Sequence, residues 1–252
     1  MKINRFIKVA VLSFALAVCA VGNARAQGTM ANLMTFDNHL VHFGIQVGIV
    51  NAKFDLDYSE DDALRREIQG VTSYFKPGFH IAIIVPDLRL GPWFNFRFLP
   101  GVTLMTRRLE YSWEPEALAA NSRAERWRTV ESVYGDIPIE FKFRAARYGN
   151  FRPYLTSGIS YGFDFASTRK NRNNTQESIV KLSANDFRIT TGVGFDFFLH
   201  YVKFAIELKM AFGMNELMVP DSDIYARSVN GLSSRVFFLT FTFEGGYETY
   251  SF

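Results

Sequence analysis

The chain has 252 residues, with 28 Lys and Arg against 25 Asp and Glu, so its formal net charge is only +3. Charges of both signs are mixed along the chain, which excludes the concentrated basic footprint of a nucleic-acid-binding protein. Cys19 is the single cysteine, so there is no disulfide framework within the chain.

The first 26 residues have the organisation of a secretory signal peptide. Three basic residues lie among residues 2–8, an apolar run extends from Val9 to Ala20, and Ala24-Arg25-Ala26 fits the cleavage pattern. The apolar run is too short for a spanning helix, which needs roughly 20 residues. We therefore expect residues 1–26 to be a signal peptide and residues 27–252 to form one domain.

Cys19 leaves one alternative for this leader. A lipoprotein would be acylated at Cys19, but Val18 precedes it where a small residue is expected. The signal peptide is therefore the preferred interpretation. After cleavage the mature chain contains no cysteine.

A two-residue alternation of apolar and other residues extends from His39 to Phe243. Its clearest example is residues 137–144, where Ile and Phe alternate with Pro, Glu, Lys and Arg. Soluble sheets also alternate, but here large apolar residues on one face oppose Gly, Thr and charged residues on the other. This distribution is typical of a membrane barrel, in which the apolar face contacts lipid and the polar face lines a hydrated lumen. The sequence predicts an all-β protein, an eight-stranded antiparallel transmembrane β-barrel.

The expected strands follow a short polar lead-in over residues 27–38. They cover residues 40–54, 74–85, 93–106, 129–144, 151–166, 185–199, 202–212 and 235–244. Their connections alternate between long (55–73, 107–128, 167–182, 213–234) and short (86–92, 145–150, 200–201). Outer-membrane barrels have short periplasmic turns and longer outer loops. We therefore expect a location in the bacterial outer membrane, in contact with its lipid and with both termini in the periplasm.

Many of the positions expected to face the lumen are charged. They are Lys76, Arg97, Glu140, Lys142, Arg144, Arg152, Asp164, Asp186, Arg188, Asp196, Lys203, Glu207 and Lys209. An eight-stranded barrel is barely wide enough for its own side chains, and an unpaired buried charge is very costly. We expect a salt-bridged network that fills the lumen, with Arg97 and Glu140 on adjacent strands. A narrow polar path or a conformational switch is the alternative.

The aromatic residues suggest two rows at the membrane interfaces. Near the short turns lie Trp93, Tyr148, Tyr154 and Tyr201; near the long loops lie Tyr74, Tyr111, Trp113, Trp127 and Tyr134. A carbohydrate-binding role for Trp113 and Trp127 is the alternative interpretation.

No catalytic, metal or cofactor motif stands out in the sequence. The four histidines, His39, His42, His80 and His200, show no triad spacing with the candidate serines Ser73 and Ser160. Gly192-Val193-Gly194 lies inside an expected strand and no helix follows it, so it is not a phosphate loop. The expectation is a protein that is not an enzyme and has no cofactor.

Several short motifs resemble the PorT family of Bacteroidetes. They are HFG at 42–44, PGF at 77–79, DLRLG at 87–91, FNFRFLPG at 94–101, IPIEFK at 137–142 and RPYL at 152–155. The resemblance covers roughly residues 39–252 and is strongest over residues 76–165. PorT proteins are small outer-membrane barrels of the type IX secretion system. The family offers no catalytic residues to carry over to this chain.

The resemblance implies an outer-membrane barrel that assists protein secretion through the type IX system without catalysis. Its partners would be other secretion-system proteins. One alternative is a stand-alone small barrel for adhesion or envelope integrity. Another is a lipid-modifying barrel enzyme, which requires a Ser/His pair near the outer leaflet.

Overall fold

The computed structural model describes residues 31–58, 68–114, 126–167, 183–218 and 229–245. The expected signal peptide, residues 1–26 with Cys19, lies outside these residues. Among the described residues no helix is long and apolar enough to cross a membrane.

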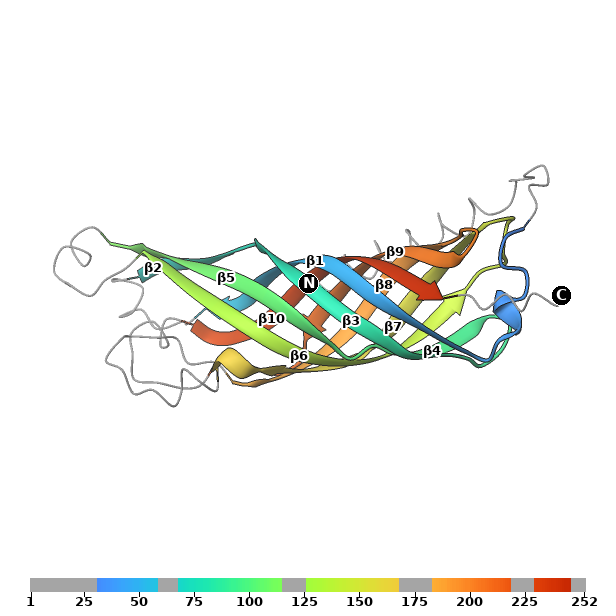
Figure 1. The fold of residues 1–252 in the computed structure, drawn as a ribbon. Coiled ribbons are helices and arrows are strands. Elements are labelled where there is room, and N and C mark those ends of the chain that lie inside the picture. Colours follow the sequence, from blue (N-terminus) through green and yellow to red (C-terminus); the bar gives the residue numbers. More distant parts are fainter. Residues whose placement is uncertain (1–30, 59–67, 115–125, 168–182, 219–228, 246–252) are drawn as a thin grey trace.

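Ten antiparallel strands form one closed sheet (Figure 1). They are β1 (Val41–Tyr58), β2 (Ile68–Tyr74), β3 (Lys76–Arg89), β4 (Phe94–Phe98), β5 (Gly101–Trp113), β6 (Trp127–Arg144), β7 (Phe151–Asp164), β8 (Asn185–Phe198), β9 (Val202–Gly213) and β10 (Val229–Gly245). β2 and β3 are successive pieces of one wall strand, as are β4 and β5. β1 pairs with both β10 and β3, which closes the ring. The predicted eight-stranded antiparallel barrel is confirmed.

Two irregularities explain the divided and shifted wall strands. Tyr74 and Phe75 are both exposed, so the alternation changes phase between β2 and β3. In β3 the pairing shifts near Val85 and Pro86, between Gly44↔Ile84 and His42↔Asp87. Pro86 has no N–H for the ladder, and a bulge is one of the few places where a sheet accepts proline.

The wall has two distinct ends, which we name by their connections. The turn end carries the short connections β3–β4, β6–β7 and β8–β9, together with residues 31–40 and the end of β10. The loop end is where the chain continues into 59–67, 115–125, 168–182 and 219–228. These four segments lie outside the described residues, and the alternation of short and long connections follows the predicted order.

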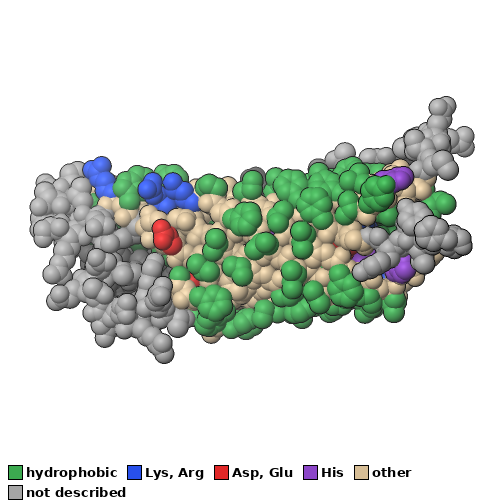
Figure 2. Space-filling model, in the orientation of Figure 1, with side chains coloured by type: hydrophobic (Ala, Val, Ile, Leu, Met, Phe, Trp, Pro, Cys, Tyr) green, Lys and Arg blue, Asp and Glu red, His purple; other side chains and the backbone are tan. Residues whose placement is uncertain are grey.

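The outer face of the barrel is apolar over most of its length. Phe, Ile, Leu and Val side chains are exposed there (Figure 2). On β6 the apolar outer face runs from Val133 to Phe143, close to the roughly 9–11 residues that a tilted strand needs to cross a bilayer. The apolar band therefore has the height of a membrane.

The wall extends beyond this band on one side of the loop end. β1, β2, β5, β6 and β10 include residues that the sequence pattern assigned to loops, namely 55–58, 68–73, 107–113, 127–128 and 229–234. In this raised wall the pattern is reversed. Arg108, Glu110 and Ser112 face out, while Leu109, Tyr111 and Trp113 are buried inside.

An apolar core fills the interior of the raised wall. It contains Phe54, Val71, Leu109, Tyr111, Trp113, Val130, Leu217 and Leu232. Polar groups outside and apolar groups inside are the arrangement of a sheet standing in water. The boundary between lipid and water therefore lies near Val133 on β6 and near Leu104 on β5.

The aromatic rows are partly different from those expected. Trp93, Tyr201, Tyr74 and Trp127 are exposed on the outer surface, as interface residues would be. However, the expectation is wrong for Tyr154, Tyr111, Trp113 and Tyr134, which are buried inside the barrel. These four occupy positions whose alternation phase points to the interior, so aromatic character alone misplaced them. Because Trp113 is buried, a surface carbohydrate site shared with Trp127 is not formed.

Candidate functional site in the lumen and its turn-end mouth

The lumen holds the charges that the alternation placed there. Twelve of the thirteen expected residues are buried, and Lys76 is half-buried. Four acidic residues that the expected network omitted also face inward: Asp37, Asp87, Asp136 and Glu244. For Asp136 and Glu244 the strand alternation contained the signal, because Asp136 is four residues before Glu140 and Glu244 has the same phase as the buried Thr240 and Thr242.

The middle of the lumen is a four-membered ionic cluster. Arg97 Nη1 lies 2.9 Å from Glu207 Oε2 and 4.0 Å from Glu140 Oε2. Lys209 Nζ lies 2.7 Å from Glu140 Oε1 and 3.4 Å from Glu207 Oε1. The Tyr154 hydroxyl donates to Glu207 Oε2 at 3.0 Å. Each cation contacts two carboxylates, so the cluster is neutral and crosses the lumen.

A second polar layer lies toward the loop end. Arg188 pairs with Asp136, and the Thr103 hydroxyl donates to the same carboxylate. His80 Nδ1 lies 2.8 Å from Thr103 Oγ1. Glycine gives this layer its space, because a Cβ at Gly162 would lie 2.6 Å from Arg188 Nη2. In the same way a Cβ at Gly194 would lie 2.2 Å from the Tyr154 ring.

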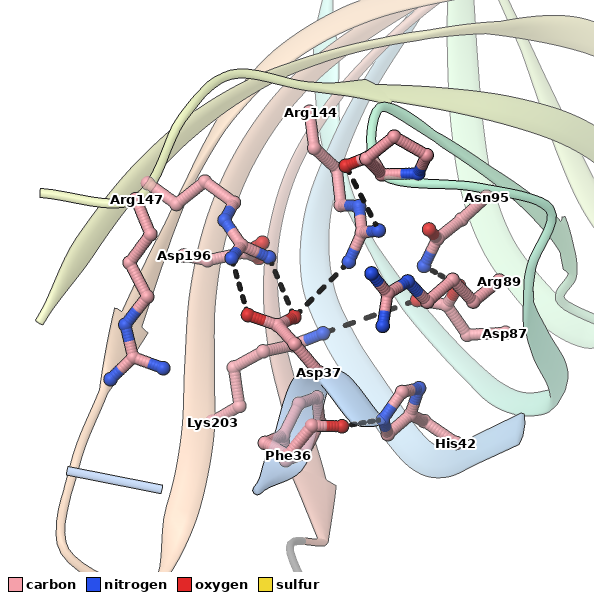
Figure 3. Close-up of polar contacts among 12 residues, drawn as sticks. Phe36, Asp37, His42, Asp87, Arg89, Asn95, Arg144, Arg147, Asp196 and Lys203 are labelled. Atoms are coloured by element: carbon pink, nitrogen blue, oxygen red, sulfur yellow. Dashed lines mark hydrogen bonds and ion pairs between the residues drawn. The ribbon is translucent and has the colours of Figure 1, made fainter. Parts of the chain in front are cut away.

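A third layer lies toward the turn end. Lys142 Nζ contacts Asp196 Oδ1 at 2.8 Å and lies over the ring of Tyr154. Lys203 pairs with Glu244 and lies 4.0 Å from Asp87, to which Asn95 also donates a hydrogen bond (Figure 3). Ion pairs therefore occur at three successive levels along the lumen, near the loop end, in the middle and near the turn end.

Residues 31–40, which we call the lead-in segment, close the turn-end mouth of the barrel. The sequence predicts a polar lead-in before the first strand; in the part that the structure describes it precedes β1, but its Leu33 and Phe36 are buried. A short 3₁₀ helix, η1 (Phe36–Asn38), places Phe36 inside the mouth. The Phe36 ring stacks on His42 at 4.0 Å and meets Phe198 edge-on. His42 Nε2 donates to the Phe36 carbonyl oxygen at 2.8 Å.

Asp37 anchors the lead-in segment to two arginines of the wall. Arg152 donates from both terminal nitrogens to the two oxygens of Asp37, with a separation of 2.8 Å between Nη1 and Oδ1. Arg144 Nη1 donates to Asp37 Oδ1 at 3.2 Å (Figure 3). Burial opposes the ionisation of Asp37, but the hydrogen bond and charge of Arg152, with Arg144 and Lys203, outweigh it. They lower the pKa of Asp37 from 3.8 to about 2.

Further contacts bind the backbone of the lead-in segment. Arg147 donates to the carbonyl oxygens of Asn32 and Leu33, and its guanidinium lies 3.7 Å from the centroid of the Phe198 ring. The Asn32 N–H donates to Asn150 Oδ1 at 2.7 Å. The mouth therefore recognises an aromatic ring, a carboxylate and backbone carbonyls of one short segment. Sequence reasoning missed this because Asp37 lies outside any alternating segment.

The serine and histidine candidates do not meet. His42 and His80 are buried in the lumen, while at the turn end His39 is half-buried and His200 is exposed. Ser73 Oγ accepts the Phe54 N–H at 2.9 Å, and Ser160 lies against Arg188. No group of three or more potential metal ligands occurs among the residues that the structure describes.

Comparisons with known proteins agree with this architecture. A family model described as "Outer membrane protein beta-barrel domain" matches residues 25–219. No curated protein matches the sequence.

Among solved structures the chain is similar to Neisserial surface protein A, with a TM-score of 0.42 and 11% identity over 81% of this chain and 97% of the other. It is also similar to OprG from Pseudomonas aeruginosa, with a TM-score of 0.43 and 12% identity over 82% and 95%. It is similar as well to the outer membrane protein AlkL, solved in lipid bilayers, with a TM-score of 0.42 and 13% identity over 90% of this chain and 97% of the other. At these identities the likeness concerns the fold alone.

Proposed function

This chain belongs to the family of outer membrane protein β-barrel domains. From its PorT-like motifs we propose that it is a non-catalytic component of the type IX secretion system. It lies in the outer membrane. In this proposal the barrel is not the conduit for secreted proteins. It acts through contacts that its ends and its outer wall make with other secretion proteins.

The observation that carries this proposal is the filled lumen. Arg97, Glu140, Glu207 and Lys209 form a neutral cluster across its middle, and the lead-in segment occupies the turn-end mouth. An interior filled with paired side chains leaves no passage for a polypeptide. A barrel of this kind serves secretion only by its surfaces, and the PorT-like motifs at 87–101 and 137–142 are the reason that we propose the type IX system.

The orientation follows from the same proposal. Short turns face the periplasm in bacterial outer-membrane barrels and longer loops face outward. The turn end, with the lead-in segment and the end of β10, then faces the periplasm, and the raised wall faces the exterior.

Deletion of the gene tests the secretion role. Cargo of the type IX system should accumulate in the periplasm, while other outer-membrane proteins assemble normally. Complementation with the intact chain should restore secretion. Normal secretion of all type IX cargo by the deletion strain would remove this proposal.

A stand-alone role in adhesion or envelope integrity is the second candidate. The raised wall favours it, because a sheet with a polar outer face and its own apolar core stands above the lipid boundary. Such a barrel would bind surface ligands without any effect on secretion. Binding to host cells or surface polymers, lost on deletion while secretion stays normal, would support this candidate.

A further inference from the structure

The turn-end mouth has the features of a peptide-binding site rather than those of a contact imposed by chain connectivity. Its recognising groups are the side chains of Arg144, Arg147 and Arg152 and the rings of His42 and Phe198. None of them relies on the covalent link between the lead-in segment and β1. Each contact is made to a feature that any short peptide can carry: a carboxylate, an aromatic ring or a backbone carbonyl.

The charges at the mouth define the occupant. Arg144 and Arg152 are both buried, and Asp37 is a carboxylate partner of both. Two guanidinium groups fixed side by side recognise a carboxylate with high geometric specificity. Without a carboxylate between them they would be like charges, buried and repelling each other. The site therefore requires an acidic ligand.

The aromatic slot fixes the residue beside the acid. The ring of Phe36 lies parallel to His42, at an interplanar angle of 12°, and meets Phe198 at 80°. Lys203 Nζ lies 4.8 Å from the centroid of the same ring. A ring between a stacked imidazole, an edge-on phenyl and a cation is bound by its π face and its edge together. An aromatic residue directly before an acidic one satisfies both halves of the site.

We propose that the turn-end mouth is a receptor for a peptide segment of a periplasmic partner protein that carries an aromatic residue followed by an acidic one, and that the lead-in segment is its built-in competitor. This rests on the proposed function, because it names the partner chemistry of the secretion contacts. The bound partner segment replaces Phe36 and Asp37 on His42, Arg144 and Arg152. The lead-in segment then leaves the mouth.

A synthetic peptide provides the test. The probe is the acetylated and amidated sequence of residues 31–38 (ANLMTFDN) with a fluorophore, together with a control peptide in which Asp is replaced by Asn. The host is the full chain carrying Phe36→Ala and Asp37→Asn, purified in detergent. Anomalous gel migration without heating verifies that the host is folded.

The native peptide should bind this host at least tenfold more tightly than the Asn peptide does, and at least tenfold more tightly than it binds the unmodified chain. Adding Arg152→Gln to the host should remove that preference. Arg126→Gln, an exposed arginine at the loop end, is the matched control and should leave it unchanged. Equal binding of the two peptides, or no binding by the folded host, would overturn the receptor. Binding to the unmodified chain as tight as to the host would do the same, since the peptide would then bind elsewhere.

The outcome is separable from the secretion role. The peptide measurement uses no cargo and no secretion machinery. A failure of peptide binding would contradict the receptor proposal and leave the secretion proposal untouched. Normal secretion in a deletion strain would contradict the secretion proposal and leave the receptor proposal untouched.

Discussion

Arg97 and Glu140 are register partners on β4 and β6, yet the guanidinium of Arg97 is closer to a residue across the lumen than to Glu140. It lies 2.9 Å from Glu207 on β9 and 4.0 Å from Glu140. Glu140 in turn receives Lys209 at 2.7 Å. The ionic cluster therefore connects opposite walls of the barrel instead of following one pair of neighbouring strands.

This arrangement predicts a large penalty for removing Glu140. Glu140→Ala leaves Lys209 with one carboxylate and unbalances a buried cluster, and breaking a buried pair by removal of one partner costs roughly 3–5 kcal/mol. The fraction of heat-modifiable, folded barrel in purified membranes should fall. Glu131→Ala is the control, because Glu131 is exposed on the outer face of the same strand. Equal abundance of the two variants would contradict the role of the cluster in stability.

The alternation of the sequence was sufficient to predict the barrel but not its height. Within the lipid band the large apolar residues face outward, and the eight segments were found from that phase. In residues 107–113 the alternation continues with Leu109, Tyr111 and Trp113 turned inward, so the same rule assigned them to a loop. Alternation in either phase predicts a strand that continues to Trp113.

The turn-end mouth was beyond reach of the sequence for a different reason. Asp37 and Phe36 belong to a short 3₁₀ helix with no periodicity of its own. Their partners Arg152, Arg144 and His42 come from distant parts of the chain. Only the closure of the ring brings these residues to one place, because β1 must pair with both β3 and β10. The sequence shows the residue types of the mouth, but it does not show that these residues lie close together in space.

The filled lumen predicts an absence of conduction. The central cluster crosses the lumen independently of the lead-in segment, so opening the mouth alone does not create a pore. Planar-bilayer recordings should show no stable large-conductance steps for the unmodified chain or for the Phe36→Ala, Asp37→Asn variant. Steps of porin size from the unmodified chain would mean that the charges do not fill the lumen. Steps from the variant alone would mean that the lead-in segment is the sole barrier.

The lowered pKa of Asp37 predicts an acid-sensitive mouth. A carboxyl group whose pKa falls from 3.8 to about 2 on docking stabilises the docked state fully above pH 3.8, and loses that contribution as the pH falls through 2. The difference corresponds to about 2 kcal/mol. The side chain is 23% exposed, so screening by solvent reduces this contribution. The lead-in segment should therefore stay docked at pH 5–8 and loosen between pH 4 and 2.

A spin label at position 34 measures that release. Met34 is 71% exposed, so a nitroxide on Met34→Cys should not disturb the packing. Its mobility should rise between pH 4 and 2. In the Asp37→Asn background the mobility should be high and independent of pH over this interval. A rise of equal size in both backgrounds would assign the acid response to other carboxylates.

The reversed alternation at the loop end predicts where the lipid boundary lies on β6. Thr129 and Phe141 both face outward on this strand, Thr129 in the raised wall and Phe141 in the apolar band. The single native cysteine, Cys19, lies in the expected signal peptide, which is cleaved on export. Each mature variant therefore carries one cysteine, at the substituted position. A membrane-impermeant maleimide should label Thr129→Cys in intact cells and leave Phe141→Cys unlabelled, because lipid covers only the latter. After solubilisation in denaturant both should react, which verifies that each cysteine is present. Labelling of Thr129→Cys only after the outer membrane is breached would place the loop end in the periplasm, and it would reverse the orientation on which the proposed partner contacts depend.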